Sequence, residues 1–156
     1  MDEIMRIQPN PIGELTWIAG GEIDECSVSL RFFGNDLDPN LMTTIMGIDP
    51  TISYRKGDIF HGKISDRIQT TGSWRYTTHK STEIGLEEQI NNLFNILPTD
   101  LDVWRDLKKF DPDLFCGLWL KEWNRSIDLS SDTLMKIGER GLRIGLDIYF
   151  DVDETD

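Results

Sequence analysis

The chain has 156 residues and carries 28 acidic against 16 basic side chains, which gives a formal net charge of −12 at pH 7. This excess of negative charge argues against a protein that binds nucleic acid by neutralising phosphates, and against one that docks on an anionic membrane. The length is typical of one domain, and the aromatic content of 10% with five tryptophans indicates a packed core.

The sequence contains no basic segment followed by an apolar one at its start, and no apolar run approaches the roughly 18 residues that span a bilayer. We therefore expect a cytoplasmic protein with reduced thiols. The two cysteines, Cys26 and Cys116, lie in predicted strands and outside any CxxC motif, which favours buried structural thiols over metal or redox chemistry. No cofactor and no metal site is predicted.

The first part of the chain contains one confident strand and one short helix. Residues 1–25 carry a turn and a short apolar stretch, and we expect an N-terminal arm or an edge hairpin. Residues 26–33 alternate between apolar and polar side chains, which predicts a strand with one buried face. A helix should follow, because Asp38 is a good N-cap, Pro39 a good first helical residue and Gly47 a good C-terminal stop.

The middle of the chain is irregular before it becomes helical. Residues 52–71 offer only short strand pieces, whereas residues 72–78 read as a strand that puts Trp74 and Tyr76 on one face and Arg75 on the other.

Two helices are predicted after this strand. The longest helical pattern opens at Ser81 or Thr82 and stops at Pro98, and a second helix is capped by Thr99 or Asp100.

The last third contains a strand, a short helix and a closing strand. A strand is predicted over residues 114–123, and Ser130 or Ser131 caps the last helix. Residues 142–150 alternate so regularly that we expect a strand whose apolar face is covered by helices. Residues 151–156 form an acidic tail, so the main domain should cover residues 26–150.

This order of elements predicts an α+β fold of the ferredoxin-like type. Two βαβ halves joined by a helical connector would form a four-stranded, mostly antiparallel sheet with helices on one face. In that topology the first and third strands are neighbours, so Cys26 and Cys116 should lie close together.

Several short motifs occur in order along residues 26–150: Leu30-Arg31-Phe32-Phe33-Gly34, Leu37-Asp38-Pro39, Gly47-Ile48-Asp49-Pro50-Thr51, Lys56-Gly57-Asp58, Gly72-Ser73-Trp74, Leu86-Glu87-Glu88-Gln89-Ile90 and the stretch from Leu142 to Tyr149. This series resembles the bacterial family called domain of unknown function 4279. The resemblance implies no settled activity. Members of the family often have a histidine where this chain has Gln89, which leaves open whether any role of that histidine exists here. By analogy, small acidic bacterial proteins of this general kind are often immunity proteins beside secreted toxins.

One candidate site would bind an anionic small molecule. A loop with two cations beside a glycine can hold an anion, and a strand rich in aromatic and basic residues, together with His79, can line the same pocket. The six candidate residues are Arg55, Lys56, Asp58, Trp74, Arg75 and Tyr76. The alternative for the loop is a turn with solvated charges. The alternative for the strand is that other segments cover its aromatic rings.

A second candidate site is acidic and would bind a basic protein. Its residues surround the second predicted helix of the middle region: Asp100, Asp102, Asp106, Asp111 and Asp113. Complementary charge would raise the association rate and set specificity. The alternative is that these acids cap helices and complement helix dipoles, and they do not follow the EF-hand pattern.

No catalytic residues are predicted. His61 and His79 are the only histidines, and no GxSxG motif or reactive cysteine accompanies them. The sequence favours a non-enzymatic protein-binding module, with an immunity protein against a basic toxin domain as the specific case. The alternative is a domain that binds or senses an anionic ligand, and an enzyme ranks last. The oligomeric state stays open.

Overall fold

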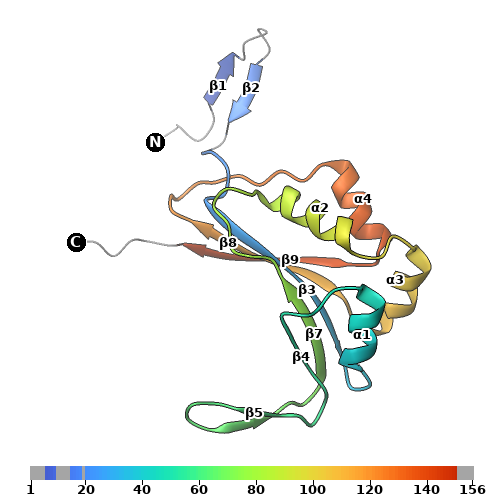
Figure 1. Cartoon of the computed structure of the whole chain (residues 1–156). Coiled ribbons are helices and arrows are strands. Elements are labelled where there is room, and N and C mark those ends of the chain that lie inside the picture. The colour runs from blue at the N-terminus through green and yellow to red at the C-terminus, as the bar shows by residue number, and fades with distance from the viewer. Residues whose placement is uncertain (1–5, 10–14, 19, 151–156) are drawn as a thin grey trace.

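The computed structural model describes residues 6–9, 15–18 and 20–150 of the chain. A mixed sheet of five strands lies at its centre: β3 (Glu25–Gly34), β4 (Ile52–Tyr54), β7 (Gly72–Thr77), β8 (Asp113–Leu120) and β9 (Arg143–Phe150). The strand order is β4-β7-β3-β8-β9 (Figure 1). All neighbours are antiparallel except β8 and β9, which run parallel.

The helices gather on one face of this sheet (Figure 1). They are α1 (Pro39–Met46), α2 (Leu86–Ile96), α3 (Leu101–Leu107), a 3-10 turn (Lys108–Phe110) and α4 (Ser131–Glu139). Two hairpins form small sheets of their own, β1 (Arg6–Pro9) with β2 (Leu15–Ile18) and β5 (Ile59–His61) with β6 (Asp66–Ile68). The predicted N-terminal arm thus contains a hairpin, and the predicted acidic tail lies outside the described residues.

The short helix α1 begins and ends where its sequence predicts. The Asp38 carboxylate accepts hydrogen bonds from the amides of Asn40, at 3.0 Å, and Leu41, while Pro39 occupies the first turn. Gly47 ends the helix in the left-handed conformation with φ of 74°, which a residue with a side chain adopts only at a cost.

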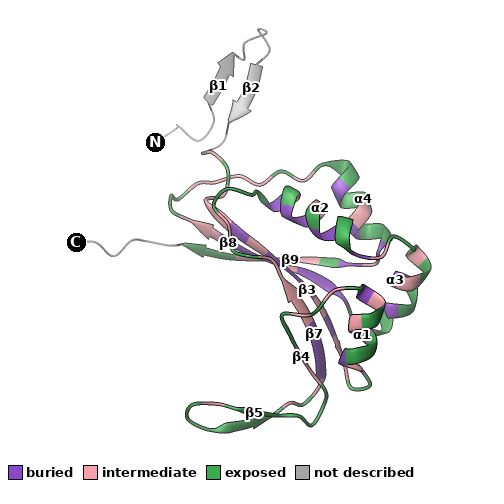
Figure 2. Ribbon diagram, in the orientation of Figure 1, coloured by how far each residue is buried: buried purple, intermediate pink, exposed green. Residues whose placement is uncertain are grey.

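The core lies between the helices and one face of β3. Cys26, Val28, Leu30 and Phe32 alternate along this strand and are almost completely buried (Figure 2). Trp74 and Trp104 flank the Phe32 ring, with centroids at 5.9 and 6.3 Å. Aromatic pairs at such distances contribute about 0.5–1.5 kcal/mol beyond the burial of their area.

The α+β class is confirmed, but the ferredoxin-like topology is wrong. The irregular stretch after α1 contains β4, one of the short strand pieces expected there, but the sequence did not place it in the central sheet. β4 is the strand that runs parallel to β3 after the crossover through α1. β7 then inserts between them, antiparallel to both. The second crossover, through α4, places β9 directly beside β8. Five strands in a mixed sheet result, not four antiparallel ones.

The predicted proximity of the two cysteines is confirmed. β3 and β8 are neighbours, and their register pairs Val28 with Cys116 and Cys26 with Leu118. The cysteines therefore occupy diagonal positions on the same face, and both are buried free thiols.

The closing strand β9 is less covered than its pattern predicts. Leu142, just before the strand, is buried, but Leu146, Ile148 and Phe150 are 48%, 58% and 58% exposed. The reason is that β9 forms the edge of the sheet, so its apolar face extends beyond the helices.

Candidate functional site

A groove with strongly acidic walls opens beside the start of α2. Its volume is about 360 Å³, and its lining includes five carboxylates: Glu22, Glu83, Glu87, Glu88 and Asp128. Leu86, Ile23 and Ile127 supply apolar surface between them. We refer to this feature as the acidic groove.

Backbone pairing between distant segments builds one wall of the acidic groove. The amide of Ile23 donates to the Ser126 carbonyl at 3.1 Å, and the amide of Ser126 donates to the Gly21 carbonyl at 2.7 Å. Asp24 anchors the same wall, because it accepts from the Lys121 amide at 2.7 Å and from Arg125 Nε at 3.0 Å. The hydrogen bond from the Lys121 amide, and then that from Arg125, lowers the pKa of Asp24 below its usual 3.8.

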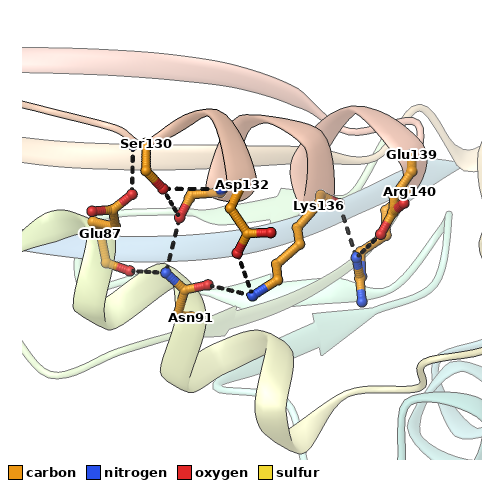
Figure 3. A network of polar contacts seen from close by, with 8 residues as sticks. Glu87, Asn91, Ser130, Asp132, Lys136, Glu139 and Arg140 are labelled. Carbon is orange, nitrogen blue, oxygen red and sulfur yellow. Dashed lines mark hydrogen bonds and ion pairs between the residues drawn. The ribbon is translucent and has the colours of Figure 1, made fainter.

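A polar network between α2 and α4 fixes the other wall (Figure 3). Glu87 accepts from the Ser130 amide at 2.6 Å, and this hydrogen bonding from Ser130 lowers the pKa of the Glu87 carboxyl. Asn91 Nδ2 donates to the Glu87 carbonyl and to Thr133 Oγ1, each at 3.0 Å. Lys136 extends the network toward Asn91. The position of Glu87 is therefore set by contacts from two helices.

The electrostatic potential of the acidic groove is negative despite the nearby helix terminus. The free amides at the start of α2 carry the equivalent of roughly half a positive charge, which stabilises Glu87 and Glu88 in the first turn. Five carboxylates outweigh that half charge, and no lysine or arginine is among the residues that line the groove. The arrangement suits a cationic group from outside.

The predicted acidic set around α3 is divided by the fold. Asp113 is buried and bound to Arg31, so it is not available to a partner. Asp100 caps α3, and Asp102 pairs with Arg105 at 2.6 Å. The remaining two, Asp106 and Asp111, are exposed; Arg105 directly precedes Asp106, and Lys108 and Lys109 lie between the two acids in the sequence. This surface is mixed in charge.

The six residues proposed for an anionic ligand do not share one pocket. Trp74 is completely buried and donates its indole N–H to Thr43 Oγ1 at 3.1 Å. Arg75 alternates with Trp74 and therefore faces the opposite side of the sheet. Arg55 pairs with Asp38 at 2.7 Å, at the base of the β5–β6 hairpin.

The other two loop residues, Lys56 and Asp58, are exposed at that same base. The Asp58 carboxylate accepts from the Arg55 amide at 2.8 Å, which closes a tight turn. Only Tyr76 of the six lines a described pocket of apolar character, together with His79.

This Tyr76 pocket has a volume of about 380 Å³ and lies between the end of β7 and α2. Ile84, Leu93 and Ile96 form its apolar walls, and Gln89 lies among its lining residues. Its size falls within the range of small-molecule sites in proteins.

Gln89 connects α2 to the core through four hydrogen bonds. Its Nε2 atom donates to the carbonyls of Cys26 and Ile84, each at 2.9 Å, and lies 3.3 Å from Cys26 Sγ. Its Oε1 atom accepts from Thr78 Oγ1 at 2.6 Å. A side chain that is 3% exposed and so fully bonded has a structural role, which accounts for the glutamine in this chain.

The five groove carboxylates were missed by sequence reasoning. Three of them, Glu83, Glu87 and Glu88, lie within six consecutive residues at the start of a predicted helix, and that clustering was the available signal. Glu22 and Asp128 join them only through the pairing of residues 21–23 with Ser126, which the sequence does not reveal.

The described residues contain neither a membrane-spanning helix nor a cluster of metal ligands. Within residues 6–9, 15–18 and 20–150, no helix has the length and apolar character needed to cross a membrane. In the same part of the chain, no three or more metal-binding side chains gather around one point.

Comparison with known proteins gives one match. A family model described as "Domain of unknown function (DUF4279)" matches residues 24–151. No curated protein and no solved structure matches the chain.

Proposed function

We propose that this chain, which belongs to the family Domain of unknown function (DUF4279), is a non-enzymatic protein-binding module that receives a basic partner in its acidic groove. The observation that carries the proposal is the convergence of five carboxylates on one groove whose lining contains no lysine or arginine. The specific case is an immunity protein that neutralises a basic toxin domain in the bacterial cytoplasm.

The dimensions and walls of the groove favour lysine or arginine side chains as the inserted groups. Both have a long aliphatic stem and a cationic head, so the stem can lie on Leu86 and Ile127 while the head reaches the carboxylates. The net charge of −12 extends the attraction beyond the groove and accelerates encounter with a basic protein.

The first experiment identifies the partner by affinity capture at low salt. The intact chain is immobilised, incubated with lysate of its native organism and eluted with a salt step, and the eluate is read by mass spectrometry. We expect one basic protein to be released by salt, because exposed charge pairs are screened. That protein is then purified for kinetics.

Association kinetics with this protein test the groove itself. We expect Glu83→Lys with Glu88→Lys to lower the association rate constant by roughly tenfold or more, as expected for loss of electrostatic steering. The matched control is Asp102→Lys with Asp106→Lys, which changes the net charge equally on α3. If both double substitutions lowered the association rate constant equally, net charge would explain the effect and the groove would be rejected as the binding site.

A second candidate function is small-molecule binding in the Tyr76 pocket. The favouring observation is an apolar cavity of about 380 Å³ with Tyr76 and His79 at its lining. A ligand present at about 100 times its dissociation constant would add about 2.7 kcal/mol to the free energy of unfolding. A thermal-shift screen of small aromatic acids, repeated with Ile96→Lys to obstruct the pocket, tests this candidate, and a shift that survives Ile96→Lys would place the ligand elsewhere.

A further inference from the structure

The outer edge of β9 is a long strand edge without a neighbour among the described residues. β9 is eight residues long and is the last strand in the order of the central sheet. The amide of Arg143 points toward the β8 side, where it donates to the Pro112 carbonyl at 3.5 Å. Alternation along the strand then directs the amides and carbonyls of Ile144, Leu146 and Ile148 outward. Long open edges of this kind template pairing with another strand.

Several side chains of this edge are exposed. Leu146 and Ile148 are 48% and 58% exposed on the helix side, and Tyr149 is 46% exposed on the other side. Tyr149 is stacked on Trp119 of β8 at a centroid distance of 5.4 Å, so its ring is held in place. Arg143 and Asp147 are the only charged side chains of the strand, and they are of opposite sign.

We propose that β9 pairs antiparallel with β9 of a second copy of this chain, around a two-fold axis at Leu146, so that two sheets join into one. Leu146 then faces Leu146 of the second copy, and Ile148 faces Ile144 of that copy. Residues with outward amides face each other in this register, as an antiparallel ladder requires. A two-fold interface uses the same surface twice and closes as a dimer.

The charges of the strand select this register. With the axis at Leu146, Arg143 faces the Tyr149 ring of the second copy and lies diagonal to its Asp147. Within one chain the Arg143 guanidinium lies 3.5 Å from the exposed Asp111 and 3.8 Å from Asp113, so an exchange of the loose contact with Asp111 for Asp147 of the second copy would form two reciprocal ion pairs beside a cation–π contact. An axis at Asp147 would bring two carboxylates together. A shift of the axis to Gly145 would leave Ile148 and Phe150 beyond the end of the neighbouring strand.

Salt should strengthen this dimer, in contrast to the proposed complex with a basic partner. Two copies of net charge −12 repel each other at low ionic strength, and added salt screens that repulsion. Salt also weakens the two exposed ion pairs, but such pairs contribute little, and the backbone pairing stays intact. The two proposals therefore have opposite salt dependence, and either can fail without the other.

Sedimentation velocity of the intact chain tests the dimer. We expect the dimer to have a dissociation constant below about 1 mM, so that it is detected as the protein concentration rises toward that value. The fraction of dimer should increase at higher salt. Ile148→Pro removes an outward amide that bonds nothing within the monomer sheet, and proline is tolerated at strand edges. We expect it to weaken the dimer at least about tenfold, because the two-fold interface loses two hydrogen bonds.

The matched control is Ile148→Thr, which retains the amide and the strand propensity. Far-UV circular dichroism and the melting temperature establish that both variants are folded. A chain that stays monomeric throughout would overturn the proposal, as would equal dimerisation of the proline and threonine variants.

Cysteine cross-linking tests the register independently of the proline variant. Residues directly opposite in a hydrogen-bonded pair have Cα atoms about 5.5 Å apart, within reach of a disulfide. Leu146→Cys should therefore cross-link two copies under mild oxidation, and Phe150→Cys should not, because its opposite position is residue 142. The native cysteines do not interfere, since both are buried. Equal cross-linking by both variants, or none by Leu146→Cys, would overturn the register.

Discussion

Arg31 binds Asp113 through two parallel hydrogen bonds across β3 and β8, with Nε 2.8 Å from Oδ1 and Nη2 2.6 Å from Oδ2. The Arg31 guanidinium also lies 4.2 Å from the centroid of the Phe115 ring. The Arg31 side chain is 21% exposed and the Asp113 side chain 4%. The ion pair is therefore partly removed from water, and it stabilises the face of the sheet that no helix covers.

Removal of the Asp113 carboxylate should be costly. We expect Asp113→Ala to lower the free energy of unfolding by about 2–3 kcal/mol, because Arg31 is left with an unpaired charge that is mostly removed from water. Urea unfolding measures the change. Arg105→Ala is the matched control, since it breaks the exposed pair with Asp102 and should change stability by less than about 1 kcal/mol. Similar losses in both variants would contradict the role of burial.

Gln89 should be needed for the stability of the fold. We expect Gln89→Leu to lower the free energy of unfolding by about 2–4 kcal/mol, since it leaves the Ile84 carbonyl and the Thr78 hydroxyl without their Gln89 partner. The Cys26 carbonyl also loses a donor but keeps its hydrogen bond from the Ser81 amide. Gln89→His, which can still donate one hydrogen bond, should cost less. Urea unfolding of both variants checks this order, with Asn92→Leu on the exposed side of α2 as the control. A reversed order would show that volume, not hydrogen bonding, decides at this position.

Local signals predicted the local features of this fold. Asp38, Pro39 and Gly47 define α1 because capping depends on residues a few positions apart. The alternation in residues 26–33 correctly predicted the buried strand β3. The proximity of Cys26 and Cys116 was inferred from the ferredoxin-like strand order, and it holds because β3 and β8 are neighbours in the observed mixed sheet as well.

Features that depend on long-range pairing could not be predicted in this way. β4 has three residues, too few for a period to be visible, yet it decides the strand order of the first half. The alternation of residues 142–150 indicates a strand, but a strand in the middle of a sheet and a strand at its edge can show the same alternation. The acidic groove likewise requires residues 22, 83–88 and 128 to meet, and no local pattern connects them.

Asp24 should give the fold a specific sensitivity to acid. Its pKa is lowered in the folded chain by the Lys121 amide and Arg125, so its ionised form stabilises the fold at pH values above the ordinary value of 3.8. That stabilisation is lost as the pH falls through 3.8 toward the lowered value, because protonation weakens both hydrogen bonds. We expect the melting temperature of Asp24→Asn to be lower than that of the parent at neutral pH, and the difference to shrink under acid. A constant difference at all pH values would contradict the assignment to titration of Asp24.

The two native thiols should be unreactive until the chain unfolds. Burial raises the pKa of Cys116 to about 12 and also raises that of Cys26, so almost no thiolate is present at about pH 8. We expect a chromogenic disulfide reagent to label neither cysteine in the native chain within the time in which it fully labels the exposed thiol of Leu146→Cys. Labelling should then rise with urea in step with the loss of circular dichroism. Fast labelling of Cys26 alone would show that the contact between Gln89 and its sulfur opens locally, and would locate the weakest part of the core at the start of α2.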